Sequence, residues 1–250
     1  MKLKHFISLV IIIVVNMQLI KGQNLSKTYD YTIKPGTKEW QNLKSYDERL
    51  NAYNIPDNLL GNMNTSDLVK TCLNYPEFRL IMTRNSLQQG YDYLKSIFNG
   101  FVELEKRKDS GKELINEYKK LNPADIKNYD TPVKRGEFSF KVKYIEVLLA
   151  QKPILANLDT ENKKRLIEKS ISNYATIETM PDEYATFGLI TPALVLGRLL
   201  DLNKQSDFTI QKSKNQKLKA FVDYTEIGDT FVLPDIISCS KAYLKQLGNE

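Results

Sequence analysis

Histidine is almost absent from the sequence: the only one among 250 residues is His5. It lies in an N-terminal segment that resembles a removable leader, so the mature chain is expected to have none. This excludes Ser–His–Asp triads, Cys–His nucleophile pairs and the usual histidine-rich zinc and iron sites. Cysteine is scarce as well. The two that occur, Cys72 and Cys239, are too far apart in the sequence to indicate a structural zinc site.

Phosphate-binding loops are also missing, because neither G-x-x-x-x-G-K-[ST] nor G-x-G-x-x-G occurs. We therefore expect no cofactor. The formal net charge is +6, but Lys2, Lys4 and Lys21 in the leader contribute three of these charges. The mature chain would carry about +3, an ordinary solubilising charge. A nucleic-acid partner is not expected, since such proteins concentrate basic residues on one face.

The first 22 residues have the three-part order of a secretory signal peptide. Two lysines precede an apolar run over residues 6–15, and Gly22 offers a small residue at a cleavage site. The run is shorter than the roughly 20 apolar residues that span a bilayer, so the mature chain should have no transmembrane span. These features predict an exported protein, periplasmic or extracellular after cleavage near Gly22. A retained N-terminal anchor is the alternative, because Ile20 is not the small residue that cleavage prefers.

The two cysteines leave two interpretations open. In an exported chain Cys72 and Cys239 can form a disulfide, which would close a very long loop and stabilise the fold by about 4 to 5 kcal/mol. Each cysteine also falls on the apolar face of a predicted helix, where a free thiol acts as a small buried hydrophobe. A disulfide requires Cα atoms within about 7 Å of each other, which spacing in the sequence does not reveal.

Apolar residues recur at spacings of three and four from residue 37 onwards, which is typical of amphipathic helices. The first such run consists of Trp40, Leu43, Tyr46, Leu50 and Tyr53. Similar runs along the chain predict about seven to nine helices and little strand. The expected fold is all-α: an irregular multi-helix bundle or a short stack of helical hairpins.

The predicted organisation is simple. Residues 23–36 read as an extended lead-in, and residues 37–250 as a single helical domain with a possible subdivision near the loop-like segment 122–136. The polar, basic segment 203–219 is expected to be a mobile surface loop, with a docking patch for an acidic surface as the alternative. Alternating apolar residues over 137–142 allow a short strand within an otherwise helical pattern.

Three groups of residues between Trp40 and Tyr118 form a recognisable combination. They are Ile55-Pro56, the segment Leu68-Val69 followed by Thr71-Cys72-Leu73-Asn74-Tyr75-Pro76, and Asn99-Gly100 with Glu103-Leu104 and Arg107 to Gly111. Through these residues, about a third of the chain resembles exported helical proteins of unknown function from Gram-negative bacteria. The resemblance implies an exported location and a helical fold. It brings no known activity and therefore no catalytic residue.

A small polar set within this region is the best candidate site: Arg84, Asn85, Glu103, Arg107 and Asp109. Arg107 and Asp109 lie in a connection between two predicted helices, where Asp109 can cap the second helix and pair with Arg107. Two interpretations are open: such a pair fixes the angle of a helical hairpin, or it lines a small polar pocket. Glu103 and Asp109 are also a carboxylate pair of the kind that general acid–base catalysis uses.

Two functional hypotheses follow. The first is an exported binding or assembly protein of the cell envelope whose partner is another envelope protein or a polymer. The second is a carboxylate-dependent hydrolase or lyase acting on an extracellular polymer, for which two carboxyl groups must lie about 5 to 10 Å apart across a substrate. The absence of recognisable catalytic motifs favours the non-enzymatic hypothesis.

Overall fold

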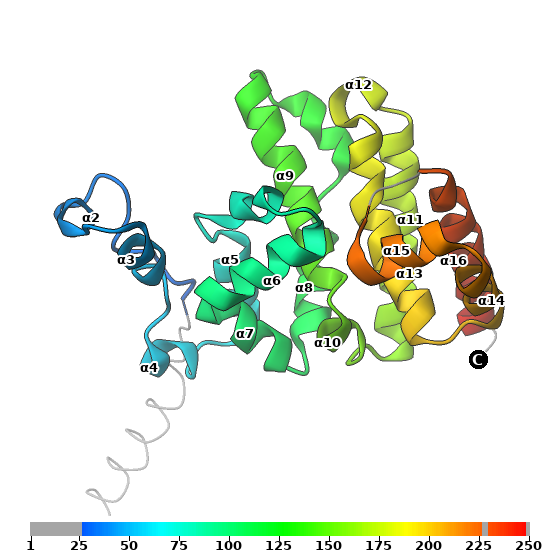
Figure 1. Ribbon diagram of the computed structural model, residues 1–250, viewed down its shortest axis with the longest axis horizontal. Coiled ribbons are helices and arrows are strands. Elements are labelled where there is room, and N and C mark those ends of the chain that lie inside the picture. The colour runs from blue at the N-terminus through cyan, green and yellow to red at the C-terminus, as the bar shows by residue number, and fades with distance from the viewer. Residues whose placement is uncertain (1–26, 227–229, 249–250) are drawn as a thin grey trace, which may run out of the picture.

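The computed structural model describes residues 27–226 and 230–248, and over these residues the chain is all-α without strands (Figure 1). The all-α prediction is thus confirmed. The predicted signal peptide, residues 1–22, lies outside the described residues. Residues 27–36, the described part of the predicted lead-in, contain no helix. None of the helices in the described ranges combines the length and apolar character needed to cross a bilayer.

Short helices form the first half of the chain. In order they are α2 (Lys38–Asn42), α3 (Tyr46–Asn51), α4 (Asp57–Leu60), α5 (Thr65–Leu73), the 3-10 helix η1 (Phe78–Thr83), α6 (Leu87–Ile97), α7 (Asn99–Lys106), α8 (Ser110–Tyr118) and the 3-10 helix η2 (Pro123–Asn128). Ser and Asn side chains cap several of them, as expected for helix N-termini: Ser45 caps α3, Asn64 caps α5 and Ser86 caps α6. Helices α2 to α4 lie at one end of the molecule, beside α5 and α7 (Figure 1).

Longer helices dominate the second half. In order they are α9 (Pro132–Leu149), α10 (Lys152–Leu155), α11 (Thr160–Glu178), α12 (Pro181–Tyr184), η3 (Thr186–Leu189), α13 (Ile190–Leu202), α14 (Ser206–Lys214), α15 (Gln216–Tyr224), η4 (Thr230–Val232) and α16 (Leu233–Gly248). Helix α9 crosses the centre of the molecule and packs against both α8 and α13. The strand considered for residues 137–142 is therefore wrong, because α9 is helical throughout this stretch.

Helix α13 is the central element of the second half. Its residues are apolar almost all round, and those from Ile190 to Leu200 are buried without interruption. It packs against α9, α11, α15 and α16. A helix that is hydrophobic on every side needs neighbours on every side, so the sequence pattern and the observed position agree.

Buried apolar side chains form one hydrophobic cluster that includes residues from Tyr31 to Leu247. The cluster continues through the segment 122–136, where Ile126 is buried and η2 packs against both α9 and α11. At the α2–α4 end the cluster is rich in aromatic rings. Tyr75 stacks on Phe98 with ring centroids 4.4 Å apart. The abundant aromatic residues are thus mainly core residues, as their helical spacing predicts.

The prediction of a mobile loop over residues 203–219 is wrong, because this segment contains α14 and the start of α15. Phe208 and Leu218 are buried in the core and hold these two helices against the rest of the molecule. Lys212 is also not part of a free basic patch. Its Nζ lies 2.8 Å from a carboxylate oxygen of Asp201 and 2.6 Å from one of Asp223.

Candidate functional site

Arg107, a member of the predicted polar set, makes structural hydrogen bonds and an ion pair within the fold. Its Nε donates to Glu103 Oε1 at 2.6 Å. Its two terminal nitrogens donate to the carbonyl oxygens of Met63 and Leu60 at 3.0 and 3.1 Å. Arg107 therefore fastens the end of α7 to the α4–α5 connection, with all three of its nitrogens occupied.

Asp109 does not pair with Arg107. It occupies the residue before α8 but makes no capping hydrogen bond with its side chain. Instead, its Oδ1 accepts a 2.8 Å hydrogen bond from the Thr65 hydroxyl at the start of α5. The proposed carboxylate pair of Glu103 and Asp109 is thus split between two different structural contacts.

Arg84 and Asn85 are exposed and lie outside this junction. The Arg84 guanidinium sits 3.9 Å from the centre of the Tyr93 ring, and its Nη1 donates to the carbonyl of the preceding Thr83. None of the pockets described below is lined by a member of the predicted set. The five residues do not form one site.

Both cysteines are free thiols in the structure. Cys72 is completely buried on α5, and burial raises the pKa of its thiol. Cys239 lies partly exposed on α16, with its Sγ 3.8 Å from Gln211 Oε1 on α14. The free buried Cys72 matches the second of the two interpretations of the sequence, a small hydrophobe in the core.

A buried carboxyl group, Glu146, lies in the core where α9 meets α8 and α13. The Tyr118 hydroxyl of α8 donates to its Oε1, and the Thr191 hydroxyl of α13 donates to its Oε2, both at 2.5 Å. Burial raises the pKa of Glu146 to about 7, although these two hydrogen bonds favour the carboxylate and act in the opposite direction. Such a pKa is common in catalytic acids and bases.

Access to solvent decides the role of this cluster. Glu146 and Tyr118 are 0% exposed and Thr191 is 1% exposed, so no substrate can reach them in this conformation. The cluster ties α8, α9 and α13 together. Sequence reasoning missed it, although a glutamate inside the apolar run from Tyr144 to Leu149 was a visible signal.

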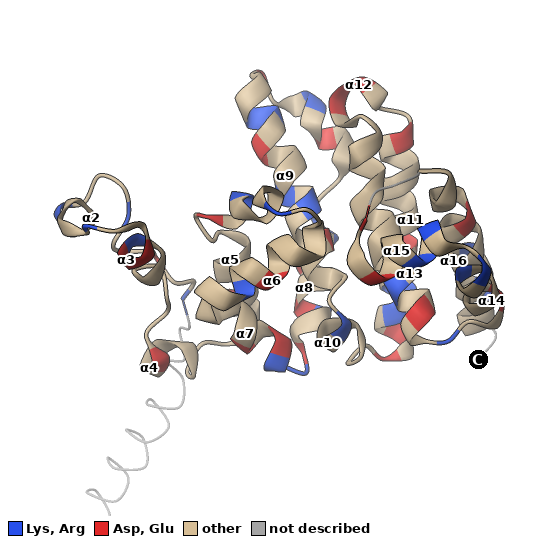
Figure 2. Cartoon of the chain, viewed as in Figure 1, with Lys and Arg blue, Asp and Glu red and all other residues tan. Residues whose placement is uncertain are grey.

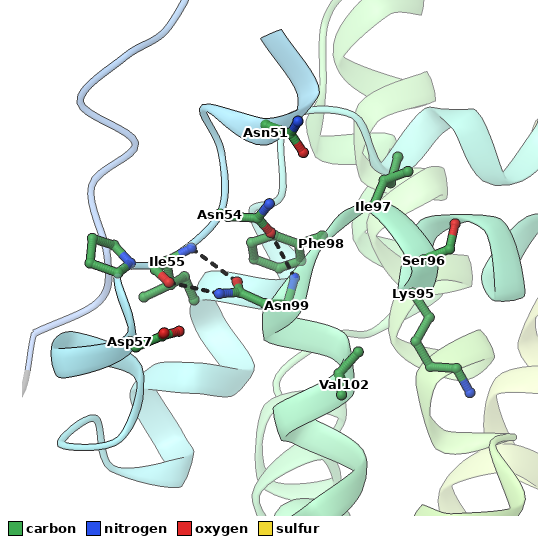
Figure 3. Close-up of a pocket in the computed structure, with 11 residues that line it drawn as sticks. Asn51, Asn54, Ile55, Asp57, Lys95, Ser96, Ile97, Phe98, Asn99 and Val102 are labelled. Carbon is green, nitrogen blue, oxygen red and sulfur yellow. Dashed lines mark hydrogen bonds between the residues drawn. The ribbon is translucent and has the colours of Figure 1, made fainter. Parts of the chain in front are cut away.

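An open pocket with a volume of about 480 Å³ lies between the α3–α4 connection and the junction of α6 with α7 (Figure 3). We refer to it as the Asn99 pocket. It is lined by Asn51, Asn54, Ile55, Pro56, Asp57, Lys95, Ser96, Ile97, Phe98, Asn99 and Val102. Its volume falls within the usual range for sites that bind small molecules.

Asn99 builds this pocket by pairing with backbone from a distant part of the sequence. Its Oδ1 accepts from the backbone N–H of Ile55 at 3.0 Å, and its Nδ2 donates to the Ile55 carbonyl at 2.7 Å. Asn54 Oδ1 in turn accepts from the backbone N–H of Asn99 at 2.9 Å. These three hydrogen bonds fix the two walls relative to each other (Figure 3).

The free surface of the Asn99 pocket is mixed in character. Asn51, Asp57 and Ser96 are exposed and offer hydrogen-bonding groups, while Val102 contributes an exposed apolar surface. Lys95 is already paired, because its Nζ lies 3.1 Å from a carboxylate oxygen of Glu105. The pocket can therefore accept a polar ligand with hydrogen-bonding groups and small apolar groups.

Comparisons with known proteins add no identification. No protein-family model matches the chain, no curated protein matches it, and no solved structure matches it. The resemblance to exported helical proteins therefore stays a prediction from the sequence.

Proposed function

We propose that the protein is an exported binding or assembly protein of the cell envelope, and that the Asn99 pocket holds a short segment of a partner protein. Export is supported by the tripartite order of residues 1–22. The binding role is supported by one observation in particular: the pocket is open, its walls are fixed by Asn99, and polar and apolar surfaces lie side by side within it.

The lining favours a peptide segment over a glycan. Amide side chains such as Asn51 both donate and accept hydrogen bonds, which matches the N–H and C=O groups of an extended peptide. Pro56, Ile97 and Val102 can receive small apolar side chains. A glycan site usually offers an aromatic face for stacking, but the only aromatic ring in the lining, Phe98, is 1% exposed.

The alternative, a carboxylate-dependent hydrolase or lyase, has less support. Of the residues that line the Asn99 pocket, only Asp57 is a carboxylate, whereas the proposed chemistry needs two across a substrate. A second pocket contains Asp182 and Glu183, but these are neighbours on the one-turn helix α12 and cannot flank a bond from opposite sides.

Selection from a random peptide library on the mature protein tests the binding role. Val102→Arg places a long charged side chain in the pocket, whereas Val133→Arg makes the same change at an exposed position on α9 outside it. We expect the selected peptides to bind the wild type and Val133→Arg equally and to bind Val102→Arg at least about tenfold more weakly. Failure to enrich any peptide, or equal binding to both variants, would contradict the proposal.

The exported location has a separate test. Expression of the full chain in a Gram-negative host, followed by fractionation and N-terminal sequencing, should give a polypeptide outside the cytosol that begins at Gln23. Recovery of only the unprocessed chain from the cytosol would contradict export without affecting the peptide-binding result.

A further inference from the structure

A second pocket, with a volume of about 370 Å³, lies between the first half of α9, the η2 region and α12. We refer to it as the α9–α12 pocket. It is at the end of the molecule where α9 and α12 both project from the body (Figure 1). Basic residues of α9 and acidic residues of α12 are found at this same end (Figure 2).

One wall of this pocket is cationic. Arg135, Ser139 and Lys143 follow each other at intervals of four on α9, so they share one face of the helix. Arg135 Nε donates to the Tyr129 carbonyl at 2.9 Å, which positions its guanidinium. Its terminal nitrogens make no hydrogen bond to the residues that the structure describes.

Lys143 is a half-buried ammonium group held among aromatic rings. Its Nζ lies 4.6 Å from the centre of the Phe187 ring and 5.5 Å from that of Phe140. Burial lowers the pKa of Lys143, while the charge of nearby Glu146 raises it. No carboxylate oxygen lies within ion-pair distance of its Nζ among the described residues, so a bound anion would compensate for water that the ammonium has lost.

The opposite wall is anionic. Asp182 and Glu183 line the pocket from α12. The position of this short helix is fixed by the next residue, because the buried Tyr184 hydroxyl donates to the Pro123 carbonyl at 2.8 Å. None of the ion pairs found among the described residues joins these two carboxylates to Arg135 or Lys143.

We propose that the α9–α12 pocket binds a small zwitterion, whose carboxylate contacts Arg135 and Lys143 and whose ammonium group contacts Asp182 and Glu183. The two walls carry equal and opposite formal charge, so a ligand of zero net charge with separated ends matches both. The acidic wall would repel a simple anion, and the basic wall would repel a simple cation. The partly exposed ring of Phe140 offers a surface for an apolar side chain.

Isothermal titration calorimetry on the mature protein tests this with four probes: L-leucine, glycyl-L-leucine, N-acetyl-L-leucine and L-leucinamide. The first two retain both charges, and comparing them distinguishes a free amino acid from the end of a peptide. The last two each lack one charge. We expect at least one of the zwitterions to bind and both blocked compounds to bind at least about tenfold more weakly.

Variants locate the binding to this pocket. Lys143→Met keeps the apolar stem and should weaken binding of the zwitterion about tenfold, whereas Lys141→Met, at an exposed position on the same helix, should not change it. Should Lys143→Met fail to fold, Asp182→Asn on the exposed side of α12 provides the same test for the ammonium end. The proposal is overturned if neither zwitterion binds at about 10 mM, if a blocked compound binds equally well, or if the pocket variants bind like the wild type.

Discussion

Glu146 should give this protein an unusual dependence of stability on pH. Burial raises the pKa of its carboxyl group from 4.5 to about 7, and the hydroxyl groups of Tyr118 and Thr191 oppose this only in part. The folded protein therefore keeps a proton that the unfolded chain releases above about pH 4.5. The stability that this proton provides is complete below that pH and is lost as the pH rises towards 7.

The size of the effect follows from the two pKa values. Each pH unit between them lowers the free energy of unfolding by about 1.4 kcal/mol, so the range from 4.5 to about 7 corresponds to about 3 kcal/mol. A typical domain has a total stability of about 5 to 15 kcal/mol, so the loss is easily measured. The sequence has no histidine after His5, which removes the side chain that usually titrates in this range.

Glu146→Gln is the informative variant, because an amide has a similar shape and does not titrate. The hydroxyl groups of Tyr118 and Thr191 can each accept a hydrogen bond from the amide nitrogen as well as donate to its oxygen. Urea unfolding followed by circular dichroism, from about pH 5 to pH 8, should show a loss of about 2.5 kcal/mol for the wild type and a flat profile for the variant.

A control variant from the same helix tests whether the pH dependence requires a buried carboxyl group or any carboxyl group. Glu137 is exposed on α9, so Glu137→Gln should retain the pH profile of the wild type. A wild-type stability that is constant over this range would refute the reasoning, as would a Glu146→Gln variant that loses stability in the same way as the wild type.

Three further predictions concern the packing of the fold, and urea unfolding measures each of them. Gly90→Ala would place a Cβ 1.9 Å from the Ile81 carbonyl oxygen and should lower the free energy of unfolding by about 3 kcal/mol or more. In Gly136→Ala, on α9, the new Cβ meets nothing within 4 Å, so this variant should raise the free energy of unfolding by about 0.5 to 1 kcal/mol. Equal stability of the two variants would contradict the close approach of α6 to η1. Arg198→Met removes a buried guanidinium that donates to four acceptors and should lower the free energy of unfolding by about 3 to 5 kcal/mol. A loss below about 1 kcal/mol would mean that these hydrogen bonds contribute little to stability. Ala185→Gly relieves a backbone with a φ of 49° and should raise the unfolding free energy by about 1 kcal/mol, and a decrease would show that this residue is not strained.

The helical architecture was predictable because helix periodicity is a local property of the sequence. Trp40, Tyr46 and Leu50 of the first run lie in helices, as do the apolar residues of α13. The first run is divided between α2 and α3, and Leu43 and Tyr53 fall just outside these two helices. The prediction of a loop over residues 203–219 was wrong because few residues of this segment contact the core. Phe208 and Leu218 are ten positions apart among polar residues, which conceals two short helices that are stabilised mainly by tertiary packing.

The pockets were not predictable in the same way, since each joins residues that are distant in the sequence. The Asn99 pocket depends on hydrogen bonds between Asn99 and Ile55, which are 44 residues apart. Nothing in helical spacing indicates which loop a given asparagine will meet. Conversely, Arg107 and Asp109 are close in sequence but bond to different partners, because the backbone between α7 and α8 turns their side chains towards different parts of the α4–α5 region.

The residues that carry the resemblance to exported helical proteins have a structural explanation. Asn99 holds Ile55, and Arg107 holds the Met63 carbonyl. A Cβ at Gly111 would lie 2.6 Å from a methyl carbon of Leu158, so glycine allows α8 to pack closely at this point. These residues form junctions between helices, so in this chain they position the elements of the fold. The specificity of the proposed peptide binding should therefore depend on lining residues outside these junctions, such as Asn51 and Val102.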